Sequence, residues 1–224
     1  MHRISLKPSH DRNSSAIRRT PDAFKVGKLP EKPTGFTISP SGSWLVATSG
    51  CKAYVAPMSD LSARFTKFVS PDQITCLAFH PSEEIFATGD AIGVIRLWYC
   101  LDPKRMPWTK DPGNTDRKTP TTTLHWHAHA VSSVAFAPNG AYLLSGGEES
   151  VLVVWQLESG HREYLPRLGA PIQSVSVVPS TSEREQEYLL SLVDGSMLLV
   201  ESNNLKITKT FLHPKRTPPI VPLS

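Results

Sequence analysis

The chain is poor in cysteine and contains no long apolar run. Its three cysteines, Cys51, Cys76 and Cys100, lie about 25 residues apart, and no CxxC pair occurs. An odd, widely spaced set argues against a disulfide framework and favours reduced thiols in a cytosolic or nuclear compartment. No stretch approaches the roughly 18 apolar residues of a membrane span, and the N-terminus lacks the apolar segment of a secretory signal. We therefore expect a protein that has no membrane partner.

Sequence motifs of catalysis are also missing. The chain contains no GxSxG, HExxH, P-loop or GxGxxG pattern. Ser145 and Ser191, with scattered histidines and aspartates, are the candidates for a hydrolase, but no motif gives them a matching context. We predict that the protein is not an enzyme, and that it has no catalytic residue, no cofactor and no small-molecule substrate.

Three alternating histidines are the candidate metal ligands. In a strand, His125, His127 and His129 would point to one face, where three imidazoles could bind zinc. A fourth ligand, either cysteine or carboxylate, does not occur nearby at a suitable spacing. We therefore predict no metal site here.

The positive charge is confined to the N-terminal arm, residues 1–30. The arm carries seven basic residues against Asp11 and Asp22, a surplus of +5, and the remaining 17 basic and 18 acidic residues leave −1. The basic residues of the arm are Arg3, Lys7, Arg12, Arg18, Arg19, Lys25 and Lys28. Such an arm can touch nucleic acid or acidic protein, or it can be a solvated leader. We predict that it is disordered.

Internal repetition is the main positive signal. Four segments share an apolar run ending in x-Pro, a polar turn and a second apolar run, with prolines at 40, 81, 138 and 179. Two of the gaps between them are 41 residues, and the middle gap is 57 because a polar loop is inserted. A period near 40 with strand-like segments is typical of a four-stranded propeller blade.

Tryptophans recur at a fixed place in the two middle repeats. Trp98 and Trp155 each follow their proline by 17 residues. The alternation in residues 94–98 fits a half-buried strand. Asp194-Gly195 marks a hairpin turn, and Gly93 and Glu149-Ser150 occupy the corresponding turns of the other repeats. No convincing amphipathic helix is present, so we predict an all-β fold.

These residues resemble WD40 repeats, a family in which His, Ser or Thr, Asp and Trp form a hydrogen-bonded structural set. The resemblance assigns His127, Ser145 and Trp155 to this set in the third repeat, with Glu149 in place of the aspartate, which leaves the network open there. The other assigned residues are Thr88 and Trp98 in the second repeat and Asp194 in the fourth, where Val200 stands in place of the tryptophan.

A narrower resemblance covers about residues 34–205 and is strongest over residues 123–169. These segments are similar to the WD-repeat protein 75 family of animals and its Nan-one type counterparts in fungi. The resemblance implies a subunit of the UTP-A (t-UTP) subcomplex of the small-subunit processome, located in the nucleolus. Its partners would be other UTP-A and processome proteins, with a pre-rRNA or snoRNA particle as a further one. The role would be to support pre-rRNA transcription and processing towards 18S rRNA.

We predict about four blades of a seven-bladed type, at about 31–60, 61–100, 122–160 and 161–212, followed by a Pro-rich tail at 213–224. Four blades do not close such a ring, and the family's members are longer, so we expect a partial propeller. The alternative is a generic WD40 adaptor in a ubiquitin ligase or signalling complex.

The inserted loop, residues 101–121, carries one aromatic residue among cations. Trp108 could stack on RNA or anchor a protein partner, or it could fold back onto the propeller while the charges are solvated. The accompanying basic residues are Lys104, Arg105, Lys110, Arg117 and Lys118.

Overall fold

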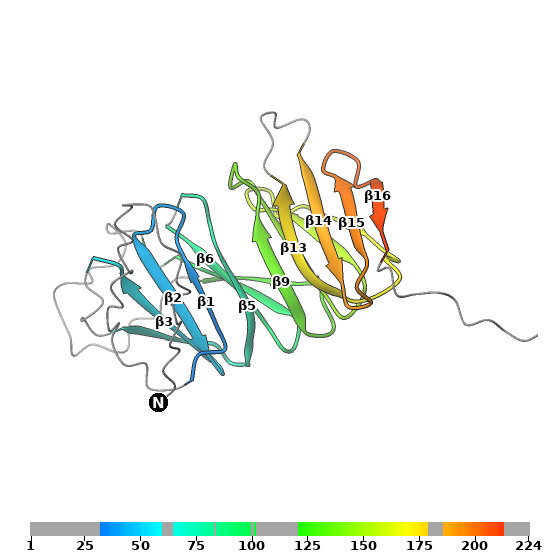
Figure 1. Ribbon diagram of the computed structural model, residues 1–224. Coiled ribbons are helices and arrows are strands. Elements are labelled where there is room, and N and C mark those ends of the chain that lie inside the picture. The colour runs from blue at the N-terminus through cyan, green and yellow to red at the C-terminus, as the bar shows by residue number, and fades with distance from the viewer. Residues whose placement is uncertain are drawn as a thin grey trace, which may run out of the picture.

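The computed structural model describes residues 32–59, 65–82, 84–99, 101, 121–178 and 186–212. Within these ranges all regular structure is β-strand, which confirms the predicted all-β class. The strands form four antiparallel four-stranded sheets, in which successive strands are neighbours (Figure 1). The N-terminal arm, nearly all of the inserted loop and the Pro-rich tail lie outside the described residues. No helix in the described residues is long and apolar enough to span a membrane.

The sheets follow one another along the chain. Sheet 1 contains β1 (Gly35–Ile38), β2 (Trp44–Ser49), β3 (Lys52–Pro57) and β4 (Thr66–Val69). Sheet 2 contains β5 (Ile74–Phe79), β6 (Phe86–Asp90), β7 (Val94–Trp98) and β8 (Thr121–His125). Sheet 3 contains β9 (Val131–Phe136), β10 (Tyr142–Gly147), β11 (Leu152–Gln156) and β12 (Arg162–Leu165). Sheet 4 contains β13 (Ile172–Val178), β14 (Glu187–Leu192), β15 (Met197–Glu201) and β16 (Ile207–Phe211).

The observed sheets differ from the expected blade segments by about one strand. Each of the first three sheets ends one strand later in the sequence than the segment predicted for it. β4 pairs with β3, β8 with β7 and β12 with β11, whereas the sequence segments place each of them with the following blade. The repeated proline marks the turn between the first and second strands, and the tryptophan marks the third. The fourth strands share no such mark, so no pattern indicates which sheet they join.

The middle strands of sheets 2 and 3 bury both of their faces, since each of these two sheets lies between two others. Ile95 and Leu97 contact sheet 3, while Trp98 points to the opposite side and packs against sheet 1. Val153 and Trp155 likewise face sheet 2, and Leu152 and Val154, which alternate with them in sequence, face sheet 4. This period-two alternation explains why apolar residues run nearly without interruption through β6, β7, β10 and β11.

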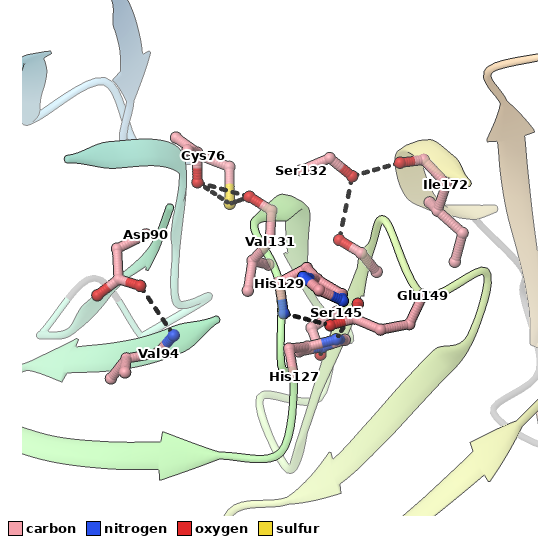
Figure 2. A network of polar contacts seen from close by, with 12 residues as sticks. Cys76, Asp90, Val94, His127, His129, Val131, Ser132, Ser145, Glu149 and Ile172 are labelled. Atoms are coloured by element: carbon pink, nitrogen blue, oxygen red, sulfur yellow. Dashed lines mark hydrogen bonds and ion pairs between the residues drawn. The ribbon is translucent and has the colours of Figure 1, made fainter. Parts of the chain in front are cut away.

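Hydroxyl groups on the first strands join neighbouring sheets. Thr75 donates to the carbonyl oxygens of Gly89, at 3.0 Å in its own sheet, and Val131, at 2.5 Å in the next. Ser132 repeats this arrangement one sheet later, donating to the carbonyls of Gly146 and Ile172 (Figure 2). The donors occupy the second position of β5 and β9. The same contact therefore sets the spacing of sheets 2, 3 and 4.

A partly buried thiol adds a second hydrogen bond between sheets 2 and 3. Cys76 donates to the Val131 carbonyl at 3.5 Å. Burial raises the pKa of Cys76 to about 12, so the thiol stays protonated at neutral pH and keeps its donor. Cys51 and Cys76 are both free, and Cys100 lies outside the described residues.

Candidate functional site

The most connected polar side chains lie in sheet 3. His127 comes from the segment between β8 and β9, Ser145 from β10, Glu149 from the β10–β11 turn and Trp155 from β11. His127 Nε2 lies 2.9 Å from Ser145 Oγ, and its Nδ1 lies 3.1 Å from Glu149 Oε2 (Figure 2). Trp155 Nε1 donates to Ser145 Oγ at 2.9 Å. His129 N donates to the other Glu149 oxygen at 2.6 Å.

The partners assign the direction of each bond. A carboxylate only accepts, so His127 Nδ1 carries the proton and donates to Glu149. Nε2 is then an acceptor, and Ser145 donates to it while accepting the indole N–H of Trp155. The donor chain runs from Trp155 through Ser145 and His127 to Glu149, and each of these polar groups has a partner.

Burial and charge act in opposite directions on these two titratable groups. Burial lowers the pKa of His127 below its ordinary 6.5, against the hydrogen bond and charge of Glu149, so the imidazole is neutral at pH 7. Burial alone would raise the pKa of Glu149, but hydrogen bonds from backbone N–H groups and from His127 bring it below the ordinary 4.5. The pair is therefore a neutral histidine beside a carboxylate.

Glu149 takes the place that the family pattern gives to aspartate. The sequence left open whether the network forms with this longer side chain. In the structure one carboxylate oxygen reaches the His127 ring and the other reaches the His129 backbone. The four-residue set is complete in sheet 3.

Sheet 2 holds a shorter version of this network. Trp98 Nε1 donates to Thr88 Oγ1 at 2.9 Å, which is the same pair as Trp155 and Ser145. Ser70 lies four residues before β5, as His127 lies four before β9, and it accepts from Arg96 at 2.8 Å. Sequence reasoning missed Ser70, because a serine in a polar turn carries no distinctive signal.

Asp90 is a second residue that the sequence did not single out. It ends β6 and is 2% exposed. Its Oδ1 accepts from Ile92 N at 3.1 Å and Val94 N at 2.8 Å, which fixes the turn (Figure 2). Among the described residues its Oδ2 has no hydrogen-bond partner. An acidic residue at the end of a strand, followed by Gly93 three residues on, was the available signal for a turn cap.

Sheet 4 replaces the polar set with apolar side chains. Leu168, Leu190 and Val200 occupy the places of His127, Ser145 and Trp155, and all three belong to the core between sheets 3 and 4. Asp194 remains in the turn, where its Oδ1 accepts from the backbone N of Ser196 at 2.9 Å and from its hydroxyl at 2.6 Å. In sheet 4 the histidine, the hydroxyl residue and the tryptophan are thus all replaced by apolar residues.

The alternating histidines do not converge. His127 is buried in the network, whereas His125 and His129 are exposed. Within the described ranges no group of three or more His, Cys, Asp or Glu side chains could hold a metal ion. The predicted contact residues Trp108, Lys104, Arg105, Lys110, Arg117 and Lys118 lie outside the described residues.

Known proteins share this chain's sequence over its middle part. A family model, WD repeat-containing protein 75 first beta-propeller, matches residues 52–185. Human WD repeat-containing protein 75 is 40% identical over 144 residues, which is 64% of this chain and 15% of the human protein. U3 small nucleolar RNA-associated protein 17 of Schizosaccharomyces pombe is 46% identical over 82 residues, covering 37% of this chain and 10% of that protein.

A third relative matches over a shorter region of this chain. NET1-associated nuclear protein 1 of Saccharomyces cerevisiae is 46% identical over 55 residues, covering 25% of this chain and 6% of that protein. The chain thus spans 15% or less of the length of these relatives. Since the family model matches more than half of its residues, the chain belongs to the family of the WD repeat-containing protein 75 first β-propeller.

Proposed function

We propose that this chain acts as a non-enzymatic scaffold in ribosome assembly, as a β-propeller component of the UTP-A subcomplex of the small-subunit processome. In this role it supports pre-rRNA transcription and processing towards 18S rRNA in the nucleolus. Family membership supports the proposal. The names of two relatives point the same way, since one is called a small nucleolar RNA-associated protein and the other a nuclear protein.

The burial and hydrogen bonding of the sheet 3 network support the proposal that the protein is not an enzyme. Ser145, His127 and Glu149 have the connectivity of a hydrolase triad, with a nucleophile, a base and an orienting carboxylate. However, Ser145 is 0% exposed and its oxygen already accepts the Trp155 N–H. A nucleophile without access to substrate has no catalytic use. The groups instead hold β10 and β11 against the segment that leads into β9.

Protein partners are the first expectation for a molecule of this kind, because the stacked sheets leave their turns and outer strands accessible for contact. A pre-rRNA or snoRNA particle is the second expected partner. Binding surfaces on loops carried by a rigid scaffold are the usual arrangement in such folds.

Affinity purification of the tagged full chain tests the proposal. We expect mass spectrometry to recover other UTP-A and processome proteins, and hybridisation to recover pre-rRNA. A matched tag without the chain gives the background. Recovery of a ubiquitin-ligase or signalling complex without processome proteins would overturn the proposal in favour of a generic adaptor.

A further inference from the structure

Two aromatic side chains from different sheets stack on the outer part of the molecule. Trp126 follows β8 of sheet 2, and Tyr164 lies in β12, the last strand of sheet 3. Their ring centroids are 5.9 Å apart and their planes differ by 29°. Trp126 also meets His127 edge-on at 5.1 Å and packs against the core between sheets 2 and 3. The tryptophan is therefore a fixed base on which Tyr164 lies.

Tyr164 presents a large aromatic surface to solvent. It is 56% exposed although one side of its ring covers Trp126. A single exposed aromatic is ordinary on a protein surface, but one whose ring is already held in a stack needs little ordering to accept another flat partner. The stack ends on the solvent side at Tyr164.

The charge next to Tyr164 is positive. Successive side chains of a strand point to opposite sides, so Arg162 shares the side of Tyr164 while Glu163 and Leu165 share the other. Leu165 packs against the core between sheets 3 and 4, which fixes that assignment. Arg162 is exposed, and the nearest carboxylate of the strand lies on the opposite face. An aromatic ring beside a cation is the combination that binds single-stranded nucleic acid.

We propose that an unpaired base of single-stranded RNA stacks on the free face of Tyr164, extending the Trp126–Tyr164 stack, with Arg162 against the adjoining phosphate. The proposal deepens the RNA part of the proposed function and rests on it. Every base has a π-face, so the site reads single-strandedness more than sequence. Duplex RNA buries these faces and does not fit.

Titration of the full chain with an RNA 12-mer containing one 2-aminopurine tests the proposal. Stacking on Tyr164 quenches the 2-aminopurine fluorescence. Tyr164→Leu retains an apolar cover on Trp126 but removes the π-face, and we expect roughly 5- to 150-fold weaker binding and loss of the quench. Tyr164→Phe retains the ring and stays near wild type. Arg162→Gln weakens binding and lowers the slope of log affinity against log salt by roughly 0.7.

Two controls make the result decisive. Phe36→Leu changes an exposed aromatic on β1 of sheet 1, and we expect unchanged RNA binding. Thermal melting of each variant shows that it is folded. Wild-type affinity in Tyr164→Leu, or loss of binding in Trp108→Ala alone, would overturn the proposed site. Failure of the site is distinguishable from failure of the proposed function, because the folded Tyr164→Leu chain is purified in parallel and tested for processome proteins.

Discussion

Individual residues of the sheet 3 network are linked in one direction, so removing the central residue Ser145 leaves two groups without a partner. Ser145 accepts from Trp155 and donates to His127, and all three side chains are buried. Replacing a residue at the centre of such a chain costs more than replacing one at its end. The sequence pointed to His127, Ser145 and Trp155 through the family pattern, but the bonds of Glu149 depended on side-chain reach, which spacing does not reveal.

Ser145→Ala tests the network at its centre. Two buried donors or acceptors, Trp155 Nε1 and His127 Nε2, lose their partner, so we expect a loss of about 2–4 kcal/mol in the free energy of unfolding. Urea denaturation measures it. Ser159→Ala, at an exposed turn, should cost under about 1 kcal/mol. Equal losses in the two variants would contradict the account.

Lowering the pH should destabilise the protein through His127. The folded-state pKa of this residue lies below 6.5, so below that pH the unfolded chain takes up a proton that the folded chain does not. Its stabilising contribution is present above pH 6.5 and falls as the pH drops. Glu149, whose pKa is also lowered, adds a loss in the same direction below pH 4.5.

Urea midpoints at pH 7.5 and 5.5 measure this dependence. We expect the wild type to lose stability at the lower pH and His127→Gln to lose less between the two values. His161→Gln, whose side chain is 65% exposed, should retain the wild-type pH dependence. An identical pH dependence in His127→Gln and the wild type would show that the histidine is not the titrating group.

At the level of sheets, close approach depends on small residues that face the next sheet. A Cβ at Gly146 would lie 2.5 Å from Ile172 Cδ1 and 2.9 Å from its Cβ. Gly89 stands in the same relation to Val131 one sheet earlier. Together with the hydroxyl contacts of Thr75 and Ser132, these glycines set the distance between each sheet and the first strand of the next sheet.

Gly146→Ala should therefore destabilise by about 1–3 kcal/mol, the usual cost of overfilling a packed core. Ile172→Val removes Cδ1, the nearest atom, and should recover part of the loss in the double variant. A double-mutant cycle by urea denaturation measures the coupling. Additive losses would mean that the two residues do not meet at the sheet boundary.

The β10–β11 turn carries a strained residue where the equivalent turns have glycine. Ser150 has φ 58°, while Gly93 and Gly195 have φ 89° and 84° at the corresponding positions. We expect Ser150→Gly to stabilise the protein by up to about 1 kcal/mol, because a side chain disfavours this region. Thermal melting measures it, with Gly195→Ser as the matched reverse change. A lower melting temperature for Ser150→Gly would contradict the expectation.

Sequence periodicity was enough to locate the strands that carry a repeated proline or tryptophan. The proline turns and the tryptophans located the first three strands of the middle sheets. It was not enough for β4, β8 and β12, whose sequences share no repeated mark. Nor could it find the stack of Trp126 on Tyr164, because that contact joins two sheets and depends on how they pack.

Across the whole molecule, four sheets share one strand order, and sheets 2, 3 and 4 differ in the side chains that fill the corresponding interior positions. Sheet 3 has the full polar set, sheet 2 a shortened one and sheet 4 an apolar one. The fold therefore tolerates replacement of the groups that resemble catalytic machinery, as expected if they serve stability. We propose that processome proteins and RNA bind to the outer surface of these sheets.

Pulse labelling of ribosomal RNA after depletion of the protein in its own cells tests the central claim most directly. A processome scaffold is needed for small-subunit rRNA, so we expect labelled 18S rRNA to fall more than the large-subunit rRNA, and the full-length protein to restore it. An unchanged ratio of small- to large-subunit rRNA would contradict the proposed role in ribosome assembly.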